Sequence, residues 1–261
     1  MVGLFSTAHS ETQKKAEMLL PSGYIDTGGI FMVFHGFQKM TMLDFPGYVA
    51  CTVFTPGCNF RCPFCHNSLL VTKVNENEIY SEDEILAYLR KRKGVIDGIC
   101  ISGGEPLMHD DIFDFVKKVK ETGMLVKIDT NGSFPDKLKK LIDSGNIDYV
   151  AMDIKNCPEK YSVTTGIQDF DFSPVRKSVE LLLEGRIACE FRTTVVKELH
   201  TPQDMVEIGE LIKGADRYFI QHFIESESNI QQGLTPLDRE EMENLRNSVV
   251  RFVKNAELRG I

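Results

Sequence analysis

The sequence lacks three features that would each narrow its class: a long hydrophobic run, an excess of positive charge and a regular cysteine framework. No apolar stretch approaches the roughly 18–20 residues of a membrane span, so we expect no membrane segment. The 38 acidic residues outnumber the 30 basic ones, and the net charge of −8 argues against nucleic-acid binding. The seven cysteines are an odd number without disulfide spacing, and we find no charged-then-apolar leader. These absences predict a cytoplasmic protein.

The chain does contain a repeat of strand-like and helix-like segments. Six apolar runs, partly β-branched or aromatic, predict buried strands at Val49–Phe54, Asp97–Ser102, Leu125–Asp129, Asp148–Asp153, Ile187–Val196 and Arg217–His222. Helices are predicted from Ser81 to about Lys93, over Asp110–Thr122, Phe134–Asp143 and Ser173–Glu184, from Thr201, and from Thr235 to about Lys254. Alternating strands and helices predict a parallel sheet with right-handed crossovers. Six such units are too few for a closed eight-stranded barrel.

Three cysteines stand close together in Cys58-Asn59-Phe60-Arg61-Cys62-Pro63-Phe64-Cys65. Three thiolates at this spacing can bind three corners of a cubane cluster, whereas a fully ligated 4Fe–4S centre takes four. The remaining cysteines are scattered singly, at Cys51, Cys100, Cys157 and Cys189. One iron would therefore stay open for an exchangeable ligand. His66 could instead complete a Cys3His zinc site, and this alternative stays open.

Polar residues also follow the predicted strands. Ser102-Gly103-Gly104-Glu105-Pro106 comes after the second strand, and its glycines would let the backbone approach a ligand closely. Glu105 or a backbone carbonyl there could accept a hydrogen bond from an ammonium group. Alone, this is a generic turn. Active sites of such architectures lie at the carboxyl ends of the strands. The position of this turn, at the end of the strand that follows the cysteine motif, therefore indicates a ligand-binding role.

The third and fourth strands end in Asp129-Thr130-Asn131-Gly132 and Asp153-Ile154-Lys155. Two carboxylates at adjacent strand ends repel each other unless a cation lies between them. The alternative is that the first segment is a helix cap with turn residues and that Lys155 reaches solvent. Arg192 falls near the middle of the fifth strand, where an unpaired charge is costly to bury. We expect its guanidinium to bind a carboxylate.

These motifs together resemble the radical S-adenosylmethionine (SAM) superfamily, whose cysteine motif carries an aromatic residue in the position of Phe64. The resemblance implies an α/β fold, a partial (β/α)6 barrel open on one side, with a 4Fe–4S cluster and SAM as cofactors. Cys58, Cys62 and Cys65 would hold the cluster. The cofactor-binding residues implied are Phe64, Gly103, Gly104, Glu105, Pro106, Asp129, Lys155, Arg192 and, packing on adenine, His222 or its neighbours Gln221 and Phe223.

Within this superfamily, residues 33–225 resemble the glycyl radical enzyme activases, and especially the activating proteins of anaerobic ribonucleoside-triphosphate reductase. The likeness lies in Gly36–Lys39, Leu43–Gly47, the cysteine motif and Met152–Lys155. It implies an enzyme that cleaves SAM reductively and takes a hydrogen atom from a glycine of that partner, with a flavodoxin- or ferredoxin-type electron donor. Asp129, Thr130 and Asp153 would bind a monovalent cation. A single cluster is expected, because no cysteine lies between Cys65 and Cys100.

Other interpretations compete with this one. A radical SAM enzyme acting on a small molecule, similar to 7-carboxy-7-deazaguanine synthase, shares the Gly-Gly-Glu-Pro turn, and a non-catalytic zinc module would use the three cysteines with His66. The basic runs Arg90–Lys93 and Lys117–Lys120 are either solvated helix faces or a docking patch for an acidic electron donor. Residues 1–31 do not fit the repeat, so we assign the radical SAM domain to 32–261. The first 31 residues are then an N-terminal extension or lie upstream of a natural start at Met32.

Overall fold

The computed structural model describes residues 32–74 and 78–261, so the predicted N-terminal extension lies outside the described residues. The strands are β1 (Val33–Phe34), β2 (Phe37–Thr41), β3 (Ala50–Thr55), β4 (Tyr80–Ser81), β5 (Gly98–Gly103), β6 (Leu125–Thr130), β7 (Tyr149–Asp153), β8 (Ala188–Val195), β9 (Arg217–His222) and β10 (Asn255–Arg259). The α-helices are α2 (Ser68–Thr72), α3 (Glu82–Lys91), α4 (Ile112–Glu121), α5 (Pro135–Ser144), α6 (Tyr161–Thr165), α7 (Ser173–Leu183), α8 (Pro202–Leu211) and α9 (Arg239–Val249).

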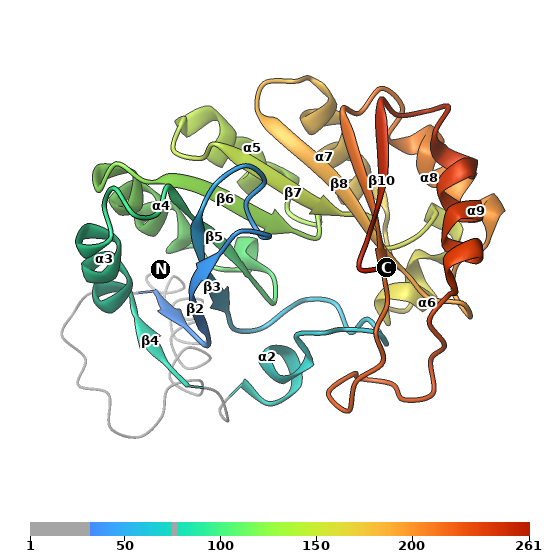
Figure 1. Cartoon of the computed structure of the whole chain (residues 1–261), viewed down its shortest axis with the longest axis horizontal. Helices are drawn as coiled ribbons and strands as arrows, with labels where there is room; N and C mark the ends of the chain where they lie inside the picture. The colour runs from blue at the N-terminus through green and yellow to red at the C-terminus, as the bar shows by residue number, and fades with distance from the viewer. Residues whose placement is uncertain (1–31, 75–77) are drawn as a thin grey trace, which may run out of the picture. The chain divides into compact units, whose positions relative to one another are not determined.

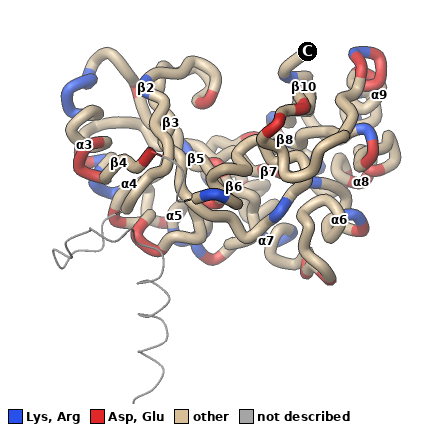
Figure 2. The backbone as a smooth tube through the Cα atoms, turned by 90° about the horizontal axis from the view of Figure 1, so that it is seen from below, with Lys and Arg blue, Asp and Glu red and all other residues tan. Residues whose placement is uncertain are grey.

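The six predicted strands are confirmed as β3, β5, β6, β7, β8 and β9, and consecutive members pair in parallel. They belong to an eight-stranded sheet of order β10-β9-β8-β7-β6-β5-β3-β2. The sheet curls into an arc with helices outside it (Figures 1 and 2). β2 and β10 are its two edge strands, and they do not pair with each other. The partial, open barrel expected from the sequence is therefore confirmed, with an additional strand at each edge.

The two edge strands were not predicted, because their residues do not form buried runs. β2 pairs antiparallel with β3 and exposes its middle residues, while β10 pairs in parallel with β9 and is only partly buried. The prediction of a last helix from Thr235 to about Lys254 was wrong at both ends. Asp238 caps α9 through a capping box with Glu241, and the β-branched and aromatic run after Val249 leads into β10 instead.

A small hydrophobic cluster lies at the amino-terminal end of the barrel. Phe45 is 1% exposed and lies with its ring centroid 5.9 Å from that of Tyr149, in a cluster with Ala50. Phe45 of the Leu43–Gly47 segment therefore packs against the ends of the strands opposite to the cysteine motif, while Leu43 is exposed. Among the described residues, no helix is long and apolar enough to span a membrane.

Candidate active site

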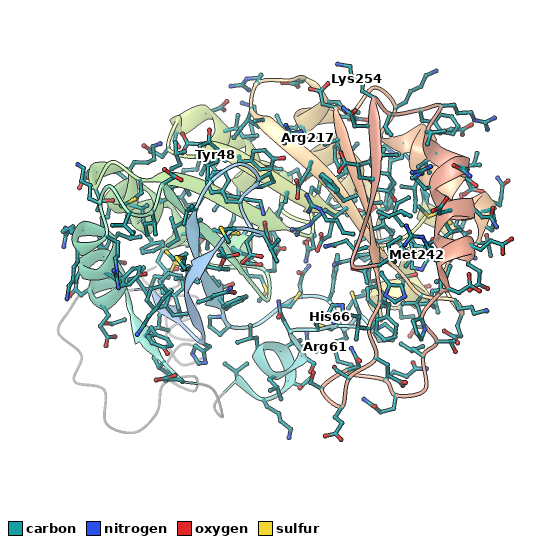
Figure 3. All side chains as sticks on the ribbon, in the orientation of Figure 1. Tyr48, Arg61, His66, Arg217, Met242 and Lys254 are labelled. Carbon is teal, nitrogen blue, oxygen red and sulfur yellow. The ribbon has the colours of Figure 1, made fainter. Side chains whose placement is uncertain are left out.

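The cysteine motif forms the loop between β3 and α2, at the carboxyl end of the strands. Backbone hydrogen bonds attach this loop to three other segments: Gly57 N–H to Leu70 C=O, Arg61 N–H to Thr165 C=O, and Gln231 N–H to Pro63 C=O, at 2.8–2.9 Å. Figure 3 shows Arg61 and His66 at this end, opposite Tyr48, Arg217 and Lys254. The loop is thus fixed on a rigid part of the fold, as a cofactor site requires.

A cavity of about 200 Å³ opens over this loop and gathers most of the predicted site residues. Its lining includes Cys58, Cys62, Phe64, Cys65, His66, Gly103, Gly104, Glu105, Asp129, Thr130, Asp153, Lys155, Arg192 and Gln221. Pro106, His222 and Phe223 do not line it. Because strand residues alternate between two faces, Gln221 faces the cavity, while His222 donates its Nε2 proton to Leu237 C=O, 2.8 Å away.

The two glycines of the turn after β5 are needed by the fold itself. Gly103 has φ +117°, and a Cβ atom on it would lie 2.3 Å from Thr55 N. A Cβ atom on Gly104 would lie 1.7 Å from Gly57 O. The two glycines allow the turn to run against the backbone of the cysteine loop, with Gly104 N–H bonded to Thr55 C=O and Glu105 N–H bonded to Gly57 C=O at 2.9 Å; whether they also approach a ligand stays a prediction.

Glu105 is completely buried and its carboxylate is already occupied. It accepts hydrogen bonds from Thr130 Oγ1 at 2.8 Å, Asn131 N–H at 2.6 Å and Leu107 N–H at 3.1 Å. Burial raises the pKa of Glu105 to about 7, although these donors act in the opposite direction. Glu105 therefore ties the turn after β5 to the turn after β6.

Arg192 lies between the two carboxylates at the ends of β6 and β7. Its Nε is 2.8 Å from Asp153 Oδ1 and its Nη1 is 3.2 Å from Asp129 Oδ2. Lys155 Nζ lies 3.0 Å from Asp153, and Lys127 Nζ lies 2.5 Å from Asp129. Burial alone would raise the pKa of Asp153, but Arg192 and Lys155 hold it below its usual range. The repulsion between the carboxylates is thus relieved within the chain, and Thr130 is turned toward Glu105.

Three site residues were missed by sequence reasoning. Lys127 is 1% exposed and neutralises Asp129, two positions along the same strand and therefore on the same face. This spacing could have revealed it. Asn131 donates to Asn59 Oδ1 at 2.9 Å, joining the turn after β6 to the cysteine loop. Asn67 donates to Gly103 C=O at 2.9 Å. Nothing in the local sequence signals these amide contacts, because they join segments far apart in the chain.

The predicted basic runs lie away from the cysteine loop. Arg90–Lys93 spans the carboxyl end of α3, and Lys117–Lys120 lies in the second half of α4, where both helices have returned to the amino-terminal ends of the strands. Lys118 pairs with Glu82, and Lys120 with Asp148 at 2.8 Å. The placement favours solvated helix faces over a docking patch that must deliver electrons to the loop.

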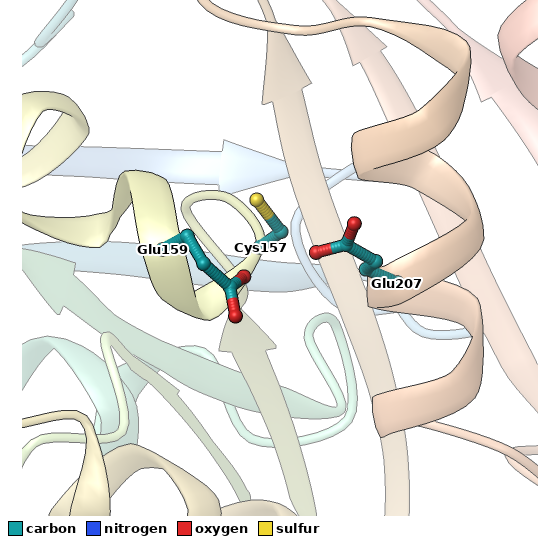
Figure 4. A group of neighbouring side chains, drawn as sticks. All are labelled: Cys157, Glu159 and Glu207. Atoms are coloured by element: carbon teal, nitrogen blue, oxygen red, sulfur yellow. The ribbon is translucent and has the colours of Figure 1, made fainter.

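The arrangement of the thiols bears on the zinc and cluster alternatives. Only one group of three or more potential metal ligands in the described part of the chain has all its ligand atoms within 4.8 Å of one another: Cys157, Glu159 and Glu207 (Figure 4). The cysteines of the motif are spread more widely. Sulfurs around one zinc ion would lie within about 4 Å of one another, because the Zn–S bond is about 2.3 Å. The donor set and its spread fit a multi-iron cluster.

The thiols of the loop must lose their protons to bind metal. Burial raises the pKa of Cys58 to about 11 and that of Cys62 to about 12, while the Lys155 ammonium acts to lower both. Binding of a cationic cluster would supply the missing compensation. In the Cys157 group, the thiol instead donates to Asp204 Oδ1 at 3.4 Å, so we assign no metal there.

Comparisons with known proteins agree with this geometry. Residues 52–224 match the Radical SAM superfamily. A protein of Methanocaldococcus jannaschii named as a putative glycyl-radical enzyme activating enzyme is 30% identical over 87% of this chain and 95% of its own length. The pyruvate formate-lyase-activating enzyme of Clostridium pasteurianum is 32% identical over 56% of this chain and 62% of its length. The crystal structure of Streptococcus suis SuiB bound to S-adenosylmethionine superposes with a TM-score of 0.61 at 17% identity, over 78% of this chain and 48% of SuiB.

The SuiB likeness concerns the fold alone, whereas the family match and the Methanocaldococcus relative cover most of the chain. Membership of the superfamily implies a 4Fe–4S cluster and SAM, and the cavity offers three thiols and a wall with acidic and basic side chains for them. The chain is therefore a radical SAM enzyme and belongs to the group of glycyl-radical enzyme activating enzymes.

Proposed function

We propose that this protein generates a glycyl radical on anaerobic ribonucleoside-triphosphate reductase. The observation that carries the activase part is the convergence of Cys58, Cys62 and Cys65 with residues of five strands, β5 to β9, on one cavity. The choice of partner rests on the sequence likeness of Gly36–Lys39, Leu43–Gly47 and Met152–Lys155 to that group of activases.

Cys58, Cys62 and Cys65 would hold the cluster. When bound, the reduced cluster would supply one electron to SAM, and the S–C5′ bond of the sulfonium would break to give methionine and a 5′-deoxyadenosyl radical that takes a hydrogen atom from a glycine Cα and leaves as 5′-deoxyadenosine. The protein's part is to bind, to orient and to exclude water. A glycine suits this reaction because it has no side chain to shield its Cα.

The cavity wall suits a zwitterionic ligand such as SAM. Three acidic side chains of the wall, Glu105, Asp129 and Asp153, lie beside two basic ones, Lys155 and Arg192, and Lys127, which does not line the cavity, pairs with Asp129. We assign Lys155 and Arg192 to the ligand carboxylate. Because Glu105 already accepts three hydrogen bonds, the backbone carbonyls of the Gly103–Gly104 turn are the better acceptors for its ammonium group.

Gln221, with His66 and Phe64, is our candidate for contact with adenine, since these side chains line the cavity and His222 does not. A sodium or potassium ion at Asp129 and Asp153 would have to share both carboxylates with Arg192. The electron donor, of the flavodoxin or ferredoxin type, would approach the face that carries the cysteine loop and the exposed Arg61, not the basic runs of α3 and α4.

The test measures 5′-deoxyadenosine from anaerobic protein, dithionite and SAM, with and without the reductase of the same organism. We expect the partner to accelerate SAM cleavage and to become active in nucleotide reduction. A reductase in which the radical-bearing glycine is replaced by alanine should bind without being activated. Acceleration by a small molecule, with no response to any glycyl radical enzyme of that genome, would replace this proposal with a small-molecule enzyme.

A further inference from the structure

The backbone of Lys155 is held from both sides by side chains that do not line the cavity. Its N–H donates to the hydroxyl of Tyr161 at 3.2 Å, and its C=O lies 2.9 Å from Nε2 of His200. The preceding carbonyl, of Ile154, accepts from Thr193 Oγ1 at 2.8 Å. The peptide groups that carry Lys155 are therefore fixed by contacts from α6, from β8 and from the turn after β8.

The hydrogen bonds of His200 define which ring nitrogen carries the proton. Lys155 C=O can only accept, so Nε2 carries the hydrogen donated to it, while Nδ1 accepts from Val196 N–H at 3.0 Å and lies 3.3 Å from Val196 C=O. The side chain is 4% exposed, and burial lowers the pKa of His200, which favours the neutral ring. His200 is thus a directed donor to a carbonyl that would otherwise be buried without a partner.

His200 lies behind two residues of the cavity wall. Its ring meets the ring of Phe64, the residue before Cys65, nearly edge-on at a centroid distance of 6.4 Å. Lys155 on its other side carries the ammonium that pairs with Asp153 at 3.0 Å and faces the cavity. A shift of the 155 peptide would move this ammonium, because in the described part of the chain Asp153 is its one ion-pair partner.

We propose that His200 is a positioning residue for the cavity: its Nε2–H holds the Lys155 backbone so that the ammonium stays directed at the carboxylate of a bound amino-acid sulfonium, SAM. This inference rests on the proposed function, since it takes SAM as the ligand. It goes beyond it by assigning a role to a residue that touches neither the ligand nor the cluster.

A double-mutant cycle tests the proposal, using anaerobically reconstituted protein and the dissociation constant of SAM measured by equilibrium dialysis. His200→Phe keeps an aromatic ring but removes the donor, and we expect SAM binding to weaken about tenfold with iron content unchanged. Lys155→Met should weaken binding by itself. In the double variant, His200→Phe should add little, because its effect passes through Lys155.

Two further variants separate positioning from packing. His200→Gln places a side-chain N–H near the position of Nε2 and should restore most of the affinity, whereas His200→Asn is too short to reach Lys155 C=O and should not. His35→Phe is the matched control, because His35 also bonds a backbone carbonyl, that of Val74 at 2.8 Å, but does not line the cavity. It should bind SAM as the wild type does.

Each outcome is decisive. If the effects of His200→Phe and Lys155→Met multiply in the double variant, or if Phe and Gln at position 200 bind SAM equally, His200 does not act through Lys155 and the inference is overturned. Loss of iron in both the Phe and the Gln variants would assign His200 to folding and would also overturn it. Failure of the wild type to bind SAM would overturn the proposed function and this inference with it.

Discussion

Gly104 leaves no room for a side chain, because its Cβ position lies 1.7 Å from the carbonyl oxygen of Gly57. The turn after β5 and the cysteine loop therefore pack backbone against backbone. Gly104→Ala should lower stability by about 3 kcal/mol or more and prevent stable iron binding, since the loop must move away. Gly185→Ala is the control: its Cβ would meet nothing within 4 Å, although φ is +72°, so only about 1 kcal/mol should be lost. Thermal unfolding and iron per chain measure both effects, and a Gly104→Ala protein with normal iron would contradict the packing.

The three cysteines of the loop should be required for the cluster and the other four should not. Reconstituted protein should hold about four irons per chain, and Ala at Cys58, Cys62 or Cys65 should abolish this. Cys189→Ser is the control, because Cys189 lies at the other end of the barrel and its thiol contacts Leu182 C=O. Stoichiometric zinc in place of iron, or loss of iron in the Cys189 variant, would count against the assignment.

The carboxylates of Asp129 and Asp153 should make SAM turnover depend on sodium or potassium. Arg192 already bridges them, so we expect the ion to modulate the rate rather than to be indispensable. Asp153→Asn should weaken this dependence. Exchanging potassium for a bulky organic cation at constant ionic strength checks the point, and an unchanged rate of 5′-deoxyadenosine formation would argue against a cation site.

Glu105 should make stability fall as the pH rises toward neutrality. Its pKa in the folded protein is raised from the ordinary value of 4.5 to about 7, so its contribution is fully present below about 4.5 and is lost as the pH rises through about 7. The stability difference between wild type and Glu105→Gln should therefore shift by up to about 3 kcal/mol in favour of the wild type between pH 8 and pH 5. Denaturant unfolding of anaerobic protein measures it. A pH-independent difference would show that the three donors keep Glu105 ionised throughout.

The sequence was informative wherever residues of one function stand close together or at comparable strand ends. Cys58, Cys62 and Cys65 identify their loop without any tertiary information, and Asp129 and Asp153 follow adjacent strands of a predictable parallel sheet. The six central strands were predictable because they are buried on both faces. Strand β10 was not, since its burial depends on pairing with β9 at an exposed edge.

The remaining site contacts depend on distances that no local pattern encodes. Arg192 was expected to bind a carboxylate, but its bridging of Asp129 and Asp153 follows from the register of β6, β7 and β8. His200 lies in a turn and meets Lys155 across 45 positions of sequence. To choose between Gln221 and His222, one must know which residues of β9 point into the cavity. A shift of one residue along the strand reverses that choice.

The most direct test of the account is the path of one hydrogen atom. Anaerobic protein, reductant and SAM should be mixed with the same organism's anaerobic ribonucleotide reductase containing glycine deuterated at Cα. We predict a stable glycyl radical by electron paramagnetic resonance, a doublet with ordinary glycine that collapses on deuteration, and 5′-deoxyadenosine that carries one deuterium atom. SAM cleavage without a glycyl signal, and with no deuterium in the 5′-deoxyadenosine, would contradict the claim that this protein activates that enzyme.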